Sequence, residues 1–330
     1  MQAAFIKQTG PPDVIQYGEL PTPTFGPRQV LVKIGAVAVN PIDTYIRNGA
    51  NYWPLPQPFI IGADFAGIVE QVGCDVQDWK PGDRVWGSNQ GLMGRQGSFA
   101  EYVAVDAHYC YPTPHEVSDE AAAASALVGI TAHLGLFQRA ELKAGETIFV
   151  NGGSGGVGSV VVQMAKAVGA KVIATAGCAE KVEAVKGLGA DLVLNYKTDD
   201  IAAAVQSFSP GGVNVYWETT REPDFEKIVP LLAERGRILL MAGRDAKPAF
   251  PVGPFYVKGC SLLGFVMFKA TPAEQRICAT DISRWLANGM LKPHIGKVLP
   301  LSQAAEAHRL QEENTLRKSN TLCGKIVLKA

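Results

Sequence analysis

A glycine-rich turn between two apolar runs constrains this chain more than any other feature. Residues Thr147–Val150 form a short β-type run, and a G-x-G-x-x-G pattern follows at Gly153–Gly158. The next segment, Val160–Val168, has the composition of a buried helix, and a second β-type run begins at Lys171–Thr175. Strand, glycine turn, helix and strand in this order indicate a dinucleotide-binding unit, whereas an isolated glycine turn would indicate only a tight bend.

The three glycines of the pattern have different roles in such a unit. The first permits a tight turn, the second lets a pyrophosphate approach the backbone, and the third lets the helix pack closely on the strand. The start of the helix then offers free N–H groups and the positive end of its dipole to the phosphates. From this segment we expect cofactor contacts at Asn151, Ser154, Gly155, Gly156 and Val157.

The tip of the second strand favours NADPH over NADH. An NAD site usually has an Asp or Glu there that accepts a hydrogen bond from the ribose 2′-hydroxyl. This chain has Thr175–Cys178, including Gly177, and its first carboxylate, Glu180, comes only at the start of the next helix. Lys181 is placed to meet a 2′-phosphate, and Tyr196 follows the next strand and would close the pocket. The alternative for Lys181 is a solvated helix face.

The composition is that of a two-domain protein with an ample core. The chain has 330 residues, 19% of them charged, and no net charge, so it has no basic stripe for nucleic acid. Met1–Gly10 lacks the pattern of a signal peptide, and the longest apolar run, Ala121–Ala132, is too short to cross a bilayer. Six scattered cysteines indicate reduced thiols, so we expect a cytoplasmic protein that binds neither nucleic acid nor a membrane.

The pattern of the chain changes near the predicted helix cap at Ser118. Before it, short alternating runs such as Gln29–Val39 predict a β domain. After it, strands and helices alternate to about residue 270, which predicts a parallel, doubly wound α/β sheet. The later predicted elements are a strand at Val213–Glu218, a helix near Pro223–Ala233, a strand at Arg237–Ala242, a last helix at Pro272–Asn288 and a closing strand at Gly324–Lys329.

The order of motifs along the whole chain resembles the medium-chain dehydrogenase/reductase superfamily, and within it the zinc-free, zeta-crystallin-like quinone oxidoreductases. The matching segments are Asn40–Gly49, Ile61–Val69, Lys80–Val85, Gly97–Tyr102, Gly129–Ala132, Gly153–Gly158 and Gly324–Leu328. The resemblance implies a GroES-like β-barrel catalytic domain at 1–122, completed by 272–330, and a Rossmann domain at 123–271. It also implies an active site in the cleft between the domains, and a homodimer with Tyr256–Phe268 in the contact.

The resemblance also indicates where zinc ligands would lie in this chain. Zinc-dependent relatives have a Cys at the position of Asn40 and a His-Glu pair at Ala63–Asp64. They also carry a lobe with four cysteines, whereas Gly87–Gly97 contains none. The five histidines show no ligand spacing, so we expect no metal.

The resemblance places the catalytic candidates on and after one short helix: Asn40, Asp43, Tyr45 and Tyr52. The amide of Asn40 would contact a substrate carbonyl or the nicotinamide ribose, but an Asn before Pro41 also forms turns. Asp43 is equally suited to capping the helix, and Tyr45 to packing. A phenol such as that of Tyr52 is a suitable proton donor to an enolate or hydroquinone oxygen.

Further cofactor contacts are expected at strand ends and from the resemblance: Thr131, Gly243, Phe265, Val266, Met267 and Lys325. Thr131 would bind near the nicotinamide, although a helix-interior Thr also bonds its own backbone. Lys325 would reach the cofactor, or lie solvated on its strand.

Three functions are compatible with this pattern. The first is an NADPH-dependent quinone oxidoreductase with a small quinone as substrate. The second is an enone or enoyl-thioester reductase that delivers hydride to a β-carbon. The third is a non-enzymatic structural or RNA-binding role, against which the neutral charge argues.

Overall fold

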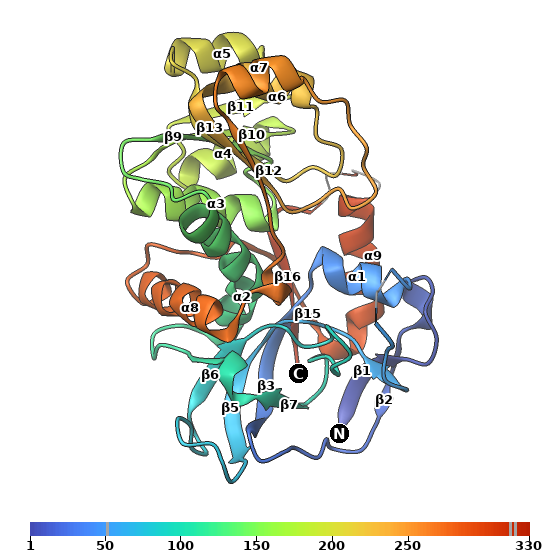
Figure 1. The fold of residues 1–330 in the computed structure, drawn as a ribbon. Helices are drawn as coiled ribbons and strands as arrows, with labels where there is room; N and C mark the ends of the chain where they lie inside the picture. Colours follow the sequence, from blue (N-terminus) through green and yellow to red (C-terminus); the bar gives the residue numbers. More distant parts are fainter. Residues whose placement is uncertain (51–52, 317–318, 320–321) are drawn as a thin grey trace. The chain divides into compact units, whose positions relative to one another are not determined.

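The chain forms two compact units. The computed structural model describes residues 1–50, 53–316, 319 and 322–330. Unit 1 combines Met1–Ile130 with Ala270–Ala330, and unit 2 is Thr131–Lys269 (Figure 1). The boundary predicted after residue 122 falls inside helix α2 (Asp119–His133). The hydroxyl of Ser118 accepts a hydrogen bond from Ala121 N–H at 3.2 Å, which confirms the predicted cap of this helix.

Unit 2 is built on a six-stranded parallel sheet in the order β11-β10-β9-β12-β13-β14. Numbered along the chain this order is 3-2-1-4-5-6, the Rossmann arrangement, and it confirms the predicted doubly wound sheet. The direction of winding reverses between β9 and β12, so the switch point lies at the carboxyl ends of these two strands. The strands are β9 (Thr147–Asn151), β10 (Lys171–Ala176), β11 (Leu192–Asn195), β12 (Val213–Glu218), β13 (Leu232–Leu240) and β14 (Ser261–Gly264).

The central strands β9, β10 and β12 of unit 2 are buried on both faces because helices cover both. Helices α3 and α4 contact β9, β10 and β11, while α5, α6 and α7 share a core with the opposite face, where Phe149 stacks on Tyr216 at 4.8 Å. Burial on both faces explains the continuous apolar runs of the sequence. The helices are α3 (Gly156–Ala167), α4 (Ala179–Gly187), α5 (Ile201–Phe208), α6 (Phe225–Leu231) and α7 (Val252–Val257).

Unit 1 is a β structure with two sheets. The larger follows the path β15-β16-β3-β5-β6-β8, with β7 also paired to β3, and the smaller has the order β2-β1-β4. The long strand β3 (Gln29–Ala38) is paired on both sides, which is why seven of its ten residues are buried. The others are β1 (Gln2–Ile6), β2 (Gln16–Glu19), β4 (Phe59–Ile60), β5 (Phe65–Val72), β6 (Arg84–Gly87), β7 (Tyr102–Asp106), β8 (Cys110–Pro112), β15 (Ile295–Pro300) and β16 (Lys325–Lys329).

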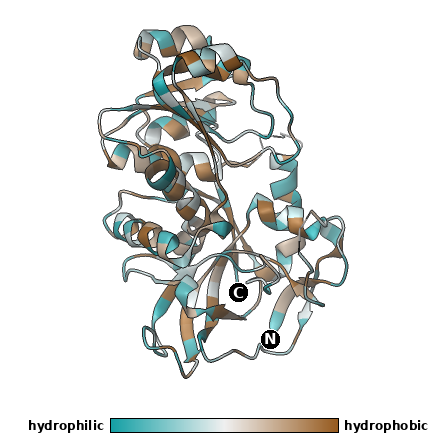
Figure 2. Cartoon of the chain, in the orientation of Figure 1, coloured by the Kyte–Doolittle hydropathy of each residue, from teal (hydrophilic) through white to brown (hydrophobic). Residues whose placement is uncertain are grey.

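Helix α1 (Pro41–Arg47) follows β3 directly, and α8 (Pro272–Ala287) and α9 (Ala304–Thr315) belong to the C-terminal part of unit 1. The prediction that the helix at 272–288 is the last one was wrong, because α9 follows it. Helix α9 buries Ala304, Ala307, His308 and Gln311, so its inner face has helical spacing but is weakly apolar. Figure 2 shows the contrast with the strands, many of which carry strongly hydrophobic segments.

Two elements of unit 2 begin four or five residues earlier than the sequence predicts. Helix α3 begins at Gly156 rather than Val160, because the glycine turn closes earlier and Gly155 is its N-cap. Strand β13 begins at Leu232 rather than Arg237. The added residues include an irregularity in the pairing of β13 with β12, where Arg235 has a positive φ of 58°.

Among the described residues, one helical stretch, Asp119–Arg139, is long and apolar enough to span a membrane by composition. Its most apolar window is 78% buried inside the protein, as in the core helix of a globular fold.

Candidate functional site

The glycine turn after β9 has little room for side chains. A Cβ on Gly153 would lie 2.9 Å from the Cβ of Ala174, and a Cβ on Gly158 would lie 2.1 Å from the carbonyl oxygen of Gly152. Gly152 has a φ of +87°, and its carbonyl accepts a hydrogen bond from Gly155 N–H at 3.1 Å. The turn therefore brings backbone, with Ser154 as its one side chain, to the start of α3, as a phosphate site requires.

A buried polar network supports this turn at the switch point. The side-chain amide of Asn151 donates to both carboxylate oxygens of Glu218, at 2.9 and 3.1 Å, and Thr220 N–H donates to the same carboxylate at 2.6 Å. Burial raises the pKa of Glu218. Glu218 was predicted only as the end of a strand, although a carboxylate that closes an apolar run is a signal in the sequence.

The other predicted cofactor residues of unit 2 also follow carboxyl ends of strands. Gly177 and Lys181 come after β10, Tyr196 after β11, Gly243 after β13, and Phe265, Val266 and Met267 after β14. Because all six strands are parallel, these positions lie along the same edge of the sheet as the glycine turn. Lys181 is buried, with 6% of its surface exposed, whereas Tyr196 is 51% exposed. Thr131 lies in α2 and is also buried.

A second polar cluster lies in unit 1, around the end of β3. The side chain of Asn40 donates to Asp64 Oδ2 at 2.7 Å and accepts from Lys325 Nζ at 2.5 Å. Lys325 also donates to Val39 O at 2.8 Å and lies 4.0 Å from Asp64 Oδ2. Asp43 accepts from Asn40 N–H at 2.8 Å. The four side chains of this buried quartet, Asn40, Asp43, Asp64 and Lys325, are each at most 6% exposed.

Burial dominates the titration of the quartet. It raises the pKa of Asp43 to about 8, with a further contribution from the charge of Asp64. Burial also raises the pKa of Asp64 and lowers that of Lys325. The charges of Lys325 and Asp64 oppose this effect of burial and favour each other's ionised form. Asp43, with its pKa of about 8, holds a proton at neutral pH.

The structure brings three predicted residues together in the quartet and adds one that the sequence prediction missed. Asn40 is the N-cap of α1, so the turn-forming alternative describes its backbone while its side chain joins the quartet. Lys325, predicted among the cofactor contacts, is buried beside Asn40 rather than solvated. Asp64 was the missed member, noted only as the position of a zinc ligand in relatives. Tyr45 is half-buried on α1, and Tyr52 lies outside the described residues.

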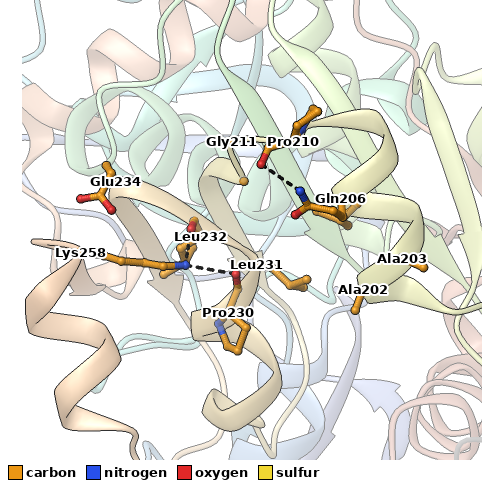
Figure 3. Close-up of a pocket in the computed structure, with 12 residues that line it drawn as sticks. Ala202, Ala203, Gln206, Pro210, Gly211, Pro230, Leu231, Leu232, Glu234 and Lys258 are labelled. Atoms are coloured by element: carbon orange, nitrogen blue, oxygen red, sulfur yellow. Dashed lines mark hydrogen bonds between the residues drawn. The ribbon is translucent and has the colours of Figure 1, made fainter.

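A cavity of about 500 Å³ opens elsewhere in unit 2. Figure 3 shows residues that line it. It is lined by α5, the loop at 210–212, the end of α6 and the start of β13, so it lies at the amino ends of β12 and β13. The ammonium of Lys258 donates there to the carbonyls of Val229, Pro230 and Leu232 at 3.2, 3.1 and 2.7 Å. Ligands of such sheets bind at the carboxyl ends, so this cavity is separate from the candidate cofactor site.

Comparison with known proteins agrees with this architecture. Residues 26–115 match the alcohol dehydrogenase GroES-like domain, and residues 156–283 match the zinc-binding dehydrogenase model. Human quinone oxidoreductase is 32% identical over 330 residues, covering 99% of this chain and 97% of the relative. Among solved structures, an NAD-dependent alcohol dehydrogenase is 31% identical with a TM-score of 0.89, and each chain is covered completely. Escherichia coli quinone oxidoreductase complexed with NADPH is 28% identical, again with complete coverage, and has a TM-score of 0.85.

The fold and its glycine turn define an oxidoreductase of the medium-chain dehydrogenase/reductase superfamily, with a GroES-like domain and a Rossmann sheet, as predicted. Within that superfamily the chain belongs to the quinone oxidoreductase family.

Zinc, which the name of one matching model implies, does not fit the residues present. In the described parts of the chain, no three His, Cys, Asp or Glu side chains are grouped so that they could hold a metal ion. The oxygens of Asn40 and Asp64 instead face the ammonium of Lys325. A positive charge at this position repels a metal cation.

Proposed function

We propose that the protein is an NADPH-dependent, zinc-independent quinone oxidoreductase. One observation carries the proposal: a glycine turn at the Rossmann switch point, next to a β10 tip that has no carboxylate. The turn suits a pyrophosphate, and the missing carboxylate suits a 2′-phosphate. The human and Escherichia coli relatives, both named quinone oxidoreductases, support the substrate class.

In this proposal the predicted residues of unit 2 hold the cofactor. Asn151, Ser154, Gly155, Gly156 and Val157 surround the pyrophosphate. Lys181 and Tyr196, which follow neighbouring strands, receive the 2′-phosphate together with the backbone of Gly177. Gly243, Phe265, Val266, Met267 and Thr131 contact the nicotinamide half.

The reaction needs one hydride and one proton for each quinone reduced to a hydroquinone. NADPH, when bound, supplies the hydride from its nicotinamide ring. For the proton we propose the phenol of Tyr52, with Tyr45 as the phenolic alternative. Asp43, whose pKa of about 8 keeps it protonated at neutral pH, is buried against Asn40 and positions this residue. Asn40 orients the quartet, since its amide already bonds both Asp64 and Lys325.

We also propose a cytoplasmic homodimer that binds neither nucleic acid nor a membrane. Strand β14 is an edge of the sheet of unit 2, and the neighbouring helix α7 exposes Val252, Tyr256 and Val257 by 62%, 69% and 71%. Exposed apolar groups beside an unpaired strand suit contact with a second copy. Light scattering of the wild type and of Tyr256→Glu tests the homodimer. The proposal requires the mass of a dimer for the wild type and weaker dimerisation for the variant, because the new carboxylate would be buried in the contact.

The test of the activity is oxidation of NADPH and of NADH by the purified, chelator-treated protein. The acceptors are an ortho-quinone, a para-quinone, a simple enone and an enoyl-CoA, followed by reduced-nicotinamide absorbance. The proposal requires turnover with a quinone and preference for NADPH. Turnover only with the enone or enoyl-CoA would replace quinone reduction by double-bond reduction. NADPH binding without any turnover would favour a non-enzymatic role.

A further inference from the structure

One peptide unit at the entrance of the glycine turn is held from both sides. The carbonyl of Asn151 accepts a hydrogen bond from the Thr219 hydroxyl at 2.5 Å. On the opposite side of the same peptide, Gly152 N–H donates to the Thr175 hydroxyl at 2.9 Å. Thr175 lies on β10 and Thr219 follows β12, the two strands that flank β9. Both neighbours of the central strand therefore hold this peptide.

Side chains behind the peptide fix the direction of the Thr175 hydroxyl. That hydroxyl donates to Asn151 Oδ1 at 3.0 Å, so its lone pairs are left to accept from Gly152. The amide of Asn151 is in turn held by the buried Glu218. The chain of bonds runs from Glu218 through Asn151 and Thr175 to the backbone of Gly152. Thr175 and Thr219 together form a threonine clamp on this peptide.

The position of Gly152 decides where the rest of the turn lies. Its carbonyl accepts from Gly155 N–H, and that oxygen approaches Gly158 so closely that a Cβ there would lie 2.1 Å away. Gly153 N–H is also bonded to the Thr175 backbone carbonyl at 2.8 Å. A displacement of Gly152 would therefore move Gly155 and the first N–H groups of α3.

We propose that Thr175 and Thr219 are positioning residues that hold the glycine turn in its phosphate-binding shape before the cofactor arrives. This inference rests on the proposed binding of NADPH. Ordering a flexible loop on binding costs affinity, so a loop that is already ordered binds more tightly. Each clamp hydroxyl is hydrogen-bonded to the Asn151–Gly152 peptide, so its effect on the cofactor passes through the backbone of the turn.

The test compares isosteric variants that lack the hydroxyls with variants that keep them. Thr175→Val and Thr219→Val remove the hydroxyls, and Thr175→Ser and Thr219→Ser are the matched controls. The measurements are the Kd values of NADPH and of 2′-AMP, which has the 2′-phosphate but no pyrophosphate, by calorimetry. We expect each valine variant to bind NADPH about tenfold more weakly. We also expect unchanged binding of 2′-AMP and near wild-type affinity in the serine variants.

A purely structural role would give a different result. It would lower the urea midpoint of the valine variants without changing the Kd of NADPH in the folded protein, and that outcome overturns the proposal. Equal losses for NADPH and 2′-AMP also overturn it, because they would place the defect outside the turn.

Hydrogen exchange of the cofactor-free protein separates the clamp from the proposed function. The clamp requires faster exchange in the peptides covering 151–158 of the valine variants than in the wild type, whether or not NADPH binds. A wild type that fails to bind NADPH overturns the proposed function, while unchanged exchange in the valine variants overturns the clamp.

Discussion

Asn40 and Lys325 are joined by a 2.5 Å hydrogen bond although 285 positions separate them in the chain. They meet because β16 pairs antiparallel with β3, with Val327 opposite Ala38, so the start of β16 lies beside the end of β3. The bond places a buried ammonium among two carboxyls and an amide. The quartet thereby links the last strand of unit 1 to its first helix.

Removing the charge of Lys325 should destabilise unit 1 strongly. Lys325→Met leaves the buried carboxylate of Asp64 without its cation, and breaking such a pair costs about 3–5 kcal/mol. We expect a loss of this size in the free energy of unfolding, measured by urea denaturation at neutral pH. Lys329→Met is the matched control: this lysine is on the same strand but 57% exposed and paired with Glu120, so we expect a loss below about 1 kcal/mol. Equal losses in the two variants would contradict the assigned role.

The proton on Asp43 should make stability fall as the pH rises. The folded pKa is about 8 and the reference value is 3.8, so between these values the native state binds more protons than the unfolded state. Stability therefore decreases with rising pH across this window. Asp43→Asn removes the titration but keeps an oxygen for Asn40 N–H. We expect the variant to gain stability relative to the wild type from about pH 4 to about pH 8 in urea unfolding. A constant difference would refute the raised pKa.

His308 on α9 should make stability fall as the pH falls, which is opposite to the effect of Asp43. It is fully buried, and burial, followed by the charge of Arg47, lowers its pKa from 6.5 to about 3. Between these values the unfolded state binds the proton that the native state excludes, so stability falls as the pH falls, by at most ~1.4 kcal/mol per pH unit. His308→Gln should flatten this slope, measured by urea unfolding at several pH values below neutrality. Parallel wild-type and variant curves would show that the histidine does not titrate in this way.

The glycine turn should not tolerate a methyl group at Gly158. In Gly158→Ala the new Cβ meets the Gly152 carbonyl, so the turn must open, and we expect NADPH affinity to fall at least about tenfold. Gly187→Ala is the control, because the added Cβ would meet no atom within 4 Å apart from its chain neighbours and the nearby backbone of its own helix. That variant should keep its NADPH affinity and gain about 0.4–1 kcal/mol in stability. Calorimetric titration with NADPH and thermal melting report the two effects.

Lys181 should discriminate between the two nicotinamide cofactors. We expect Lys181→Ala to raise KM for NADPH about tenfold or more and to leave KM for NADH nearly unchanged, because only NADPH carries the 2′-phosphate. Lys186→Ala removes a lysine from the same helix, 53% exposed and paired with Glu183, and should change neither value. Steady-state kinetics with both cofactors measures the effect. An equal loss with both would remove the 2′-phosphate role.

The parts of the fold that were predictable are those with local causes. The glycine turn, the cap at Ser118 and the strands around them depend on neighbouring residues, so their pattern is visible in the sequence. Helix α9 was not predicted because its buried positions are Ala, His and Gln rather than large apolar residues. The quartet was not predicted as a cluster for a different reason. Asn40 is hydrogen-bonded to Asp64, 24 positions away, and to Lys325, 285 positions away. The periodicity of a sequence gives no information about contacts between such distant positions.

The place of β16 has a consequence for the order in which the protein is made. This strand lies between β15 and β3, inside the larger sheet of unit 1, yet it is formed by residues 325–329. During synthesis the contiguous unit 2 would therefore be complete and able to fold before β16, the neighbour of β3, has been made. Until residues 325–329 have been made, nascent unit 1 would leave Ala36–Ala38 at the end of β3 without this neighbour, exposed to chaperones or to other chains.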